Sequence, residues 1–178
     1  MKNKCKLFIN NFVLLFAVFS CASLFAQTNN DLNGLNQVIN TFKNAITDDS
    51  KETDFYNLFL HESITWDTVL EGKTKDKLQS TGKQRPFGAS NFKDFYSFVS
   101  NNNCKEDFYN ITIGYDHNYA TLSFDYTFLK DDKIQNWGKE YWTLLKVEGQ
   151  WKITSVIWTT NYQNIEKCPF VNSSYYKF

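Results

Sequence analysis

The chain has 178 residues, enough for one domain or two small ones, and its 19 basic and 19 acidic side chains leave no formal net charge. Without bulk positive charge it is not expected to hold a polyanion such as nucleic acid, and a hydrophobic content of 42% excludes a largely disordered chain. Aromatic residues make up 18%, against only seven Gly and two Pro, which favours long strands and large rings around either a thick core or a cavity.

The first 26 residues have the features of a secretory signal peptide: a basic start, an apolar run over 12–19, and Leu24-Phe25-Ala26 before Gln27. We therefore predict an exported, periplasmic or secreted protein that begins at Gln27. The apolar run is too short for a membrane span, and no later stretch is long enough. The alternative is a lipid anchor at Cys21.

The N-terminal half of the remaining chain predicts mainly helix. Apolar residues at helical spacing indicate two helices, and a third follows a strand and a polar, lysine-rich loop. In chain order, we expect helices over 32–46 and 51–60, a strand over 64–70, a loop over 72–88 and a helix over 91–100.

The C-terminal half predicts a meander of long strands. Turn signals separate runs over 108–115, 119–129, 134–147 and 151–162, and a tail follows over 163–178. Gly138 interrupts the third run, so we expect a bulge or bend there. Without a repeat or linker, residues 27–162 form one α+β domain with its helices on one face of an antiparallel sheet.

This order of elements, with the Ile64-Thr65-Trp66-Asp67 strand and the hairpin around Gly149-Gln150-Trp151-Lys152-Ile153, resembles the nuclear transport factor 2-like superfamily, closest in style to its SnoaL-like (polyketide cyclase-like) members. The resemblance covers about residues 31–162. It implies a cone-shaped, curved antiparallel sheet wrapped around three helices from the N-terminal half. It also implies an apolar cavity in the cone and, in many members, sheet-to-sheet dimers.

No motif in the sequence points to a metal or a cofactor. His61 and His117 fall in different contexts, and Cys104 and Cys168 lack the spacing of metal ligands. The glycine-rich and nucleophile motifs of hydrolases and nucleotide-binding proteins do not occur. We therefore expect no metal and no cofactor.

The resemblance implies that carboxylates and tyrosines inside the cone transfer protons. The catalytic candidates are Asp67, His61, Asp125 and Glu140. A catalytic carboxyl must be desolvated so that its pKa rises toward the working pH. Strand alternation counts against Asp67 and Asp125, which oppose the large rings beside them and are then surface acids. His61 can instead complement a helix C-terminus.

Both faces of the last hairpin are rich in apolar side chains, which suggests that another chain covers one face. We assign the cavity-lining, ligand-binding rings to Tyr56, Trp66, Tyr126 and Tyr141. Trp142 and Trp158 then lie on the outer face and predict a homodimer interface. A bulge at Gly138 would exchange the places of Tyr141 and Trp142, and single exposed rings on strands are ordinary.

Two cysteines in an exported chain suggest a disulfide, here Cys104–Cys168, which would pin the tail to the start of the meander; two buried thiols are the alternative. The lysine-rich loop from Lys73 to Arg85 could attract an anion, but Asp76 interrupts its charge, which favours a solvated loop.

Two functions fit these observations. The first is an exported domain whose aromatic-lined cavity binds a small apolar or amphipathic ligand without catalysis. The alternative is a cofactor-independent acid–base enzyme, an isomerase, cyclase or dehydratase of the SnoaL or ketosteroid-isomerase style. A third possibility is an interaction domain with a filled cone. The direction of the candidate acids discriminates between the first two.

Overall fold

The computed structural model describes residues 30–82 and 87–170. The predicted signal peptide over 1–26, with Cys21, and the end of the tail over 171–178 lie outside these residues. The chain divides into two units, Met1–Gln37 and Val38–Phe178. In the first unit the described residues, 30–37, are helical, and this helix continues to residue 45. Within the described ranges, no helix is both long and apolar enough to cross a membrane.

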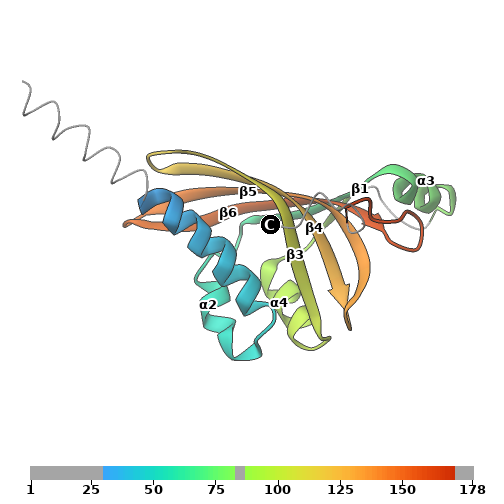
Figure 1. Cartoon of the computed structure of the whole chain (residues 1–178), viewed down its shortest axis with the longest axis horizontal. Coiled ribbons are helices and arrows are strands. Elements are labelled where there is room, and N and C mark those ends of the chain that lie inside the picture. The colour runs from blue at the N-terminus through green and yellow to red at the C-terminus, as the bar shows by residue number, and fades with distance from the viewer. Residues whose placement is uncertain (1–29, 83–86, 171–178) are drawn as a thin grey trace, which may run out of the picture. The chain divides into compact units, whose positions relative to one another are not determined.

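The second unit is an α+β fold built on one sheet. The sheet is curved and open, in the strand order β2-β1-β6-β5-β4-β3, and every neighbouring pair is antiparallel except β1 with β6. Helices α2 and α4 lie together on one side of it (Figure 1). After the helix that ends at residue 45, the elements are η1 (Asp49–Lys51), α2 (Glu52–Tyr56), β1 (Thr65–Leu70), α3 (Gly72–Ser80), β2 (Phe87–Ala89), α4 (Phe92–Ser100), β3 (Cys104–Asp116), β4 (Tyr119–Lys130), β5 (Lys133–Val147) and β6 (Gln150–Tyr162).

Helix α4 shows how local sequence places the rings that cover the sheet. The Asn91 side chain caps the helix by accepting a hydrogen bond from the Asp94 backbone N–H at 2.8 Å. Its buried residues Phe92, Tyr96 and Val99 recur at helical spacing, so they form one apolar stripe. That stripe turns the aromatic side of the helix toward the sheet.

The two faces of the sheet differ sharply in chemistry. We call the face that carries Leu122, Phe124 and Tyr126 of β4 the inner face; all three side chains are at most 1% exposed. Phe124 pairs with Glu140 of β5 and Leu122 pairs with Trp142, so the even-numbered residues of β5 share this face. The inner face is therefore an aromatic core surface that also carries a carboxyl group.

The predicted face assignment of the last hairpin was wrong. Trp142 is 1% exposed on the inner face, and Trp158 pairs with Glu140 on the same face, whereas Tyr141 is 47% exposed on the outer face. Neither tryptophan is thus available to the predicted interface. No bulge at Gly138 causes this exchange, because Gly138 stays paired with Tyr126 in unshifted register; the inner face is the one that carries Trp142 throughout. Sequence alternation alone gives each strand two faces without saying which is inner.

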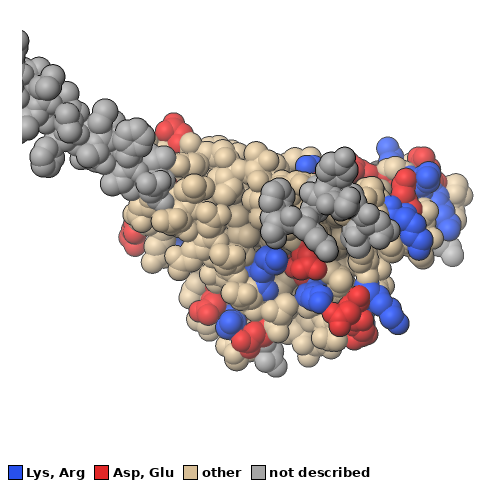
Figure 2. All heavy atoms as spheres, viewed as in Figure 1, with Lys and Arg blue, Asp and Glu red and all other residues tan. Residues whose placement is uncertain are grey.

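The predicted polar loop over 72–88 instead contains α3 and β2. Helix α3 is anchored by its one buried residue, Thr74, whose hydroxyl accepts a hydrogen bond from the Tyr162 backbone N–H at 2.8 Å. Most of the rest of α3 is polar, and Figure 2 shows acidic and basic side chains intermixed around it. The mixed charge agrees with a solvated element more than with an anion site.

The predicted Cys104–Cys168 disulfide is not formed in the structure, although both residues are buried. Cys104 alternates with Glu106 and so begins β3 on the inner face. The segment after β6 lies against the other face, where the Trp137 Nε1–H donates to the Glu166 carbonyl at 2.9 Å and the Phe170 ring contacts Trp137. The two cysteines belong to opposite sides of the sheet.

Gly138 is required where β5 and β6 approach each other. A Cβ atom at this position would lie 2.0 Å from the Thr159 carbonyl oxygen, far inside van der Waals contact with rigid backbone. We expect Gly138→Ala to lower the free energy of unfolding by about 1–3 kcal/mol, as overpacking does, in urea denaturation.

The matched control is Gly114→Ala in β3, whose Cβ would meet the Thr121 hydroxyl oxygen, a rotatable side-chain atom, at 3.1 Å. We expect that variant to change stability by no more than about 0.5 kcal/mol. Equal effects of the two substitutions would contradict the close approach at Gly138.

Candidate functional site

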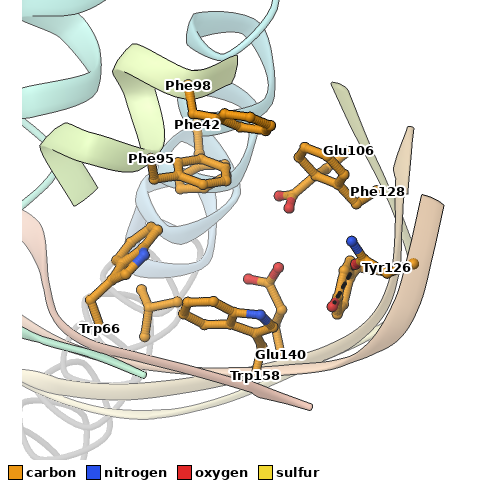
Figure 3. A pocket seen from close by; sticks show the side chains of 11 residues that line it. Phe42, Trp66, Phe95, Phe98, Glu106, Tyr126, Phe128, Glu140 and Trp158 are labelled. Carbon is orange, nitrogen blue, oxygen red and sulfur yellow. Dashed lines mark hydrogen bonds between the residues drawn. The ribbon is translucent and has the colours of Figure 1, made fainter. Parts of the chain in front are cut away.

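A cavity of about 200 Å³ lies between the inner face of the sheet and the rings of the helices. In Figure 3 the helix rings close it from one side and the strands from the other. Its lining combines aromatic side chains with a few polar ones: Phe42, Trp66, Phe95, Phe98, Glu106, Tyr126, Phe128, Asn136, Glu140, Val156 and Trp158.

Two carboxyl groups point into this cavity from strands on either side of β4 (Figure 3). Glu106 of β3 is 7% exposed and Glu140 of β5 is 4% exposed. The Trp142 indole N–H, two residues along β5, donates to Glu140 Oε2 at 2.7 Å. By contrast, Glu106 Oε2 is buried without a hydrogen-bond partner among the described residues. A buried, unpartnered carboxyl oxygen in a cavity is a functional-site signal.

Burial controls the protonation of this pair. Desolvation raises the pKa of Glu140 to about 7, although the hydrogen bond from Trp142 opposes the rise. Desolvation also raises the pKa of Glu106 well above its ordinary value; the nearby Glu140 raises it further, and Lys43 opposes both effects. The two acids titrate as a coupled pair, and Glu140 can gain or lose a proton near neutral pH.

Tyr126 forms the polar floor of the cavity between the two acids. Its hydroxyl lies 3.1 Å from the Asn136 side-chain oxygen and 3.0 Å from the Thr159 carbonyl oxygen, and its single proton serves one of these acceptors at a time. Burial raises the pKa of the Tyr126 phenol well above its ordinary value, so it stays neutral. Its contact with the Thr159 carbonyl joins β4 to β6.

Phe98 marks the mouth of the cavity. It lines the cavity and yet is 49% exposed, and its ring stacks on that of Phe128 with centroids 6.3 Å apart. Elsewhere in the lining, the Trp66 and Trp158 rings meet edge to face at 5.7 Å. A ligand that enters past Phe98 would therefore meet aromatic walls as well as the two acids.

The structure brings together three of the residues predicted from the sequence to be catalytic or to line the cavity: Glu140, Trp66 and Tyr126. Two predicted lining residues lie elsewhere. Tyr56 packs in α2 with its hydroxyl donating to Glu52 Oε1 at 2.9 Å, and Tyr141 faces outward.

The other catalytic candidates lie outside the cavity. Asp67 is half-buried on the outer face, opposite Trp66, and His61 is exposed in the loop after α2. Asp125 is also on the outer face, where it forms an ion pair with Lys139 at 3.2 Å and accepts a hydrogen bond from the Asn110 amide. For the two aspartates this agrees with the alternation of side chains along each strand, which predicted that Asp67 and Asp125 lie on the face opposite the large rings.

Sequence reasoning missed Glu106, and it placed Trp158 on the wrong face. The sequence pattern predicts that this strand begins at Phe108, whereas β3 begins at Cys104 and so includes Glu106. Extending the alternation back from Phe108 by two residues places Glu106 on the inner face. That extension was the available signal. Among the described residues, no group of His, Cys, Asp or Glu side chains is arranged to hold a metal ion.

Comparison with known proteins identifies the fold. No protein-family profile matches the sequence, and no curated protein matches it. Among similar solved structures is an NTF2-like family protein from Streptomyces avermitilis, provisionally assigned as a dehydratase, with 9% identity and a TM-score of 0.54 over 75% of this chain and 98% of that one.

Two further solved structures of NTF2-like proteins are similar to this chain. An NTF2-like protein with a cystatin-like fold from Novosphingobium aromaticivorans has 8% identity and a TM-score of 0.54 over 77% of this chain and 86% of that one. An NTF2-like protein of unknown function from Silicibacter pomeroyi has 12% identity and a TM-score of 0.51 over 75% and 98%. The chain has the NTF2-like fold, as its sequence resemblance implied.

Glu140 links the stability of the protein to pH. Because its pKa is about 7 in the folded state against an ordinary value of 4.5, the folded protein binds this proton more tightly than the unfolded chain does. Its contribution to stability is therefore complete below the unfolded pKa and is lost as the pH rises through 7. The shift corresponds to about 3 kcal/mol, and Glu106 acts in the same direction.

We expect Glu140→Gln to flatten the fall in unfolding free energy between about pH 5 and about pH 8, measured by urea denaturation. Asp67→Asn, on the outer face, should keep the wild-type dependence. Identical pH profiles for the wild type and Glu140→Gln would contradict the buried, proton-binding carboxyl.

Proposed function

We propose that the cavity is the active site of a cofactor-independent acid–base enzyme that acts on a small, largely apolar substrate. The observation that carries this proposal is the pair of buried carboxyl groups, Glu106 and Glu140, directed into an aromatic cavity. Desolvated acids of this kind have pKa values near the working pH, which general acid–base catalysis requires.

Glu140 is the proton-transfer group in this proposal. With a pKa of about 7 it is present in both forms at neutral pH, so it can take a proton from a substrate and return it. The hydrogen bond from Trp142 fixes the orientation of its carboxyl group. Glu106, with its unpartnered Oε2, binds a polar group of the substrate, and the rings of Trp66 and Trp158 hold the apolar part.

The fold is compatible with such chemistry without specifying it. The Streptomyces avermitilis protein of the same fold is provisionally assigned as a dehydratase. A dehydratase needs a group that removes a proton and one that returns a proton to the leaving hydroxyl, and one carboxyl group can do both in turn.

A generic proton-abstraction substrate tests the role of Glu140. In 5-nitrobenzisoxazole a base removes the ring C–H proton while the N–O bond breaks, which gives a coloured cyano-nitrophenolate and needs no other reactant. We expect the protein to catalyse this elimination with a pH–rate midpoint near the pKa of Glu140, about 7. Glu140→Gln should reduce the rate about 10²–10⁴-fold, which is the usual contribution of a general base.

Two variants complete the test. Asp67→Asn should keep the wild-type rate, because Asp67 lies on the outer face. Trp142→Phe removes the hydrogen bond that lowers the pKa of Glu140, so the pH–rate midpoint should move upward. A rate that is unchanged in Glu140→Gln would overturn the assignment.

The second candidate is a domain that binds a small apolar or amphipathic ligand without catalysis. It is favoured by the preponderance of aromatic rings in the lining and by the hydrogen bond that already occupies Glu140 Oε2. Native mass spectrometry of the purified protein would detect a retained ligand. Ligand retention together with no elimination activity would favour this candidate over the enzyme.

We also propose a homodimer formed through the outer face of the sheet. Tyr141 and Ile157 are directly paired across β5 and β6 and are 47% and 38% exposed, and Val69 of β1 is 41% exposed nearby on the same face. A second copy offers the same apolar surface, so a two-fold contact would bury both.

Sedimentation at micromolar concentration tests the dimer. We expect a dimer for the wild type and a monomer for Tyr141→Glu, because a charge in the centre of a buried apolar contact is left without a partner. Lys75→Glu on α3 should remain dimeric. A wild type that is monomeric throughout would contradict this proposal.

We further propose that the protein is exported and that its mature form begins at Gln27. The support is the basic, apolar and small-residue pattern of residues 1–26. Lipid attachment at Cys21 is the alternative.

A further inference from the structure

The charges around the cavity are all of one sign. Of its described lining residues, Glu106 and Glu140 are acidic and none is Lys or Arg. Lys43 acts on Glu106 electrostatically, but its ammonium lies 5.4 Å from the centre of the Phe108 ring and does not line the cavity. A ligand in the cavity therefore meets carboxyl groups with no fixed cation between them.

The uncharged part of the lining also favours a cation over an anion. The rings of Phe95, Trp66 and Trp158 surround the space in front of the acids (Figure 3). The face of an aromatic ring carries partial negative charge and attracts a cation, most strongly for Trp and where water is excluded. An anion would be repelled both by the rings and by Glu140.

One acceptor in the cavity lacks a donor. Glu106 is only 7% exposed, and its Oε2 atom is buried without a hydrogen-bond partner among the described residues. Leaving such an atom unpaired is unfavourable, and a bound donor would remove that penalty. An ammonium group supplies up to three N–H donors and a positive charge, so it can satisfy Glu106 and still contact the rings.

We propose that the ligand of this cavity carries a protonated amine, which pairs with Glu106 and is surrounded by the aromatic rings. This inference deepens the proposed function by naming the class of substrate, and it rests on that proposal for the location of the site. Glu106 anchors the ammonium group, and Glu140 remains the group that transfers a proton on the same substrate.

Three small molecules of similar size and different charge test this inference on the wild-type protein. They are benzylamine, which is protonated at neutral pH, benzyl alcohol and benzoate. In isothermal titration calorimetry at fixed ionic strength, we expect benzylamine to bind at least about tenfold more tightly than benzyl alcohol, and benzoate to bind most weakly. Equal affinities for benzylamine and benzyl alcohol would overturn the inference.

A single variant locates the contact. Glu106→Gln keeps the size and a hydrogen-bonding group but removes the carboxyl group that can ionise opposite an ammonium, and it should reduce benzylamine binding to the level of benzyl alcohol. Asp67→Asn, which removes an acid from the outer face, should bind benzylamine as the wild type does. Full retention of benzylamine binding in Glu106→Gln would overturn the pairing, and the wild-type ligand series stands even if this variant folds poorly.

The two proposals fail separately. If benzylamine shows no preference while elimination of 5-nitrobenzisoxazole still depends on Glu140, the amine class is wrong and the acid–base function stands. If benzylamine is preferred through Glu106 but no elimination occurs, the cavity is an amine-binding site without catalysis.

Discussion

Burying two carboxyl groups in an aromatic interior removes their hydration, and the rest of the site follows from how the protein compensates for that loss. Glu140 receives a hydrogen bond from Trp142 and keeps a pKa near 7. Glu106 has no such donor on Oε2, and both burial and the neighbouring Glu140 favour its protonated form. Because a pair like this is unfavourable in a purely structural role, it is best explained by chemistry or recognition in the cavity.

The fold holds the pair in place through strand order and one close backbone contact. β4 separates the strands of the two acids, so Glu106 and Glu140 converge over Tyr126 (Figure 3). The Tyr126 hydroxyl lies 3.0 Å from the Thr159 carbonyl oxygen, and Gly138 leaves room for that same carbonyl. The aromatic residues of the composition are thereby explained: they span the distance between helices and curved sheet and desolvate the acids.

The sequence was sufficient for the class of fold and for part of the site. Hydrophobic alternation and the hairpin around Gly149 predicted the meander, and Glu140 was among the catalytic candidates. The register between β4 and β5 decides on which side of the sheet Trp142 and Tyr141 lie. The alternation of residues within a single strand does not determine that register. Glu106 was missed because an acidic residue at the edge of a strand pattern resembles a turn. Helix α3 was not predicted because Thr74 is its one buried residue, so the helix has no apolar stripe in the sequence.

The protonation of the two acids is the central claim of this account, and it can be measured directly. Selective ¹³C labelling of the glutamate side-chain carboxyls, assigned with Glu106→Gln and Glu140→Gln, would follow each group through a pH titration by NMR. The account predicts that the Glu140 signal titrates near pH 7 and that the Glu106 signal titrates well above the ordinary value of 4.5. Titration of both signals near the ordinary value of 4.5 would show hydrated, independent carboxylates and would contradict the account.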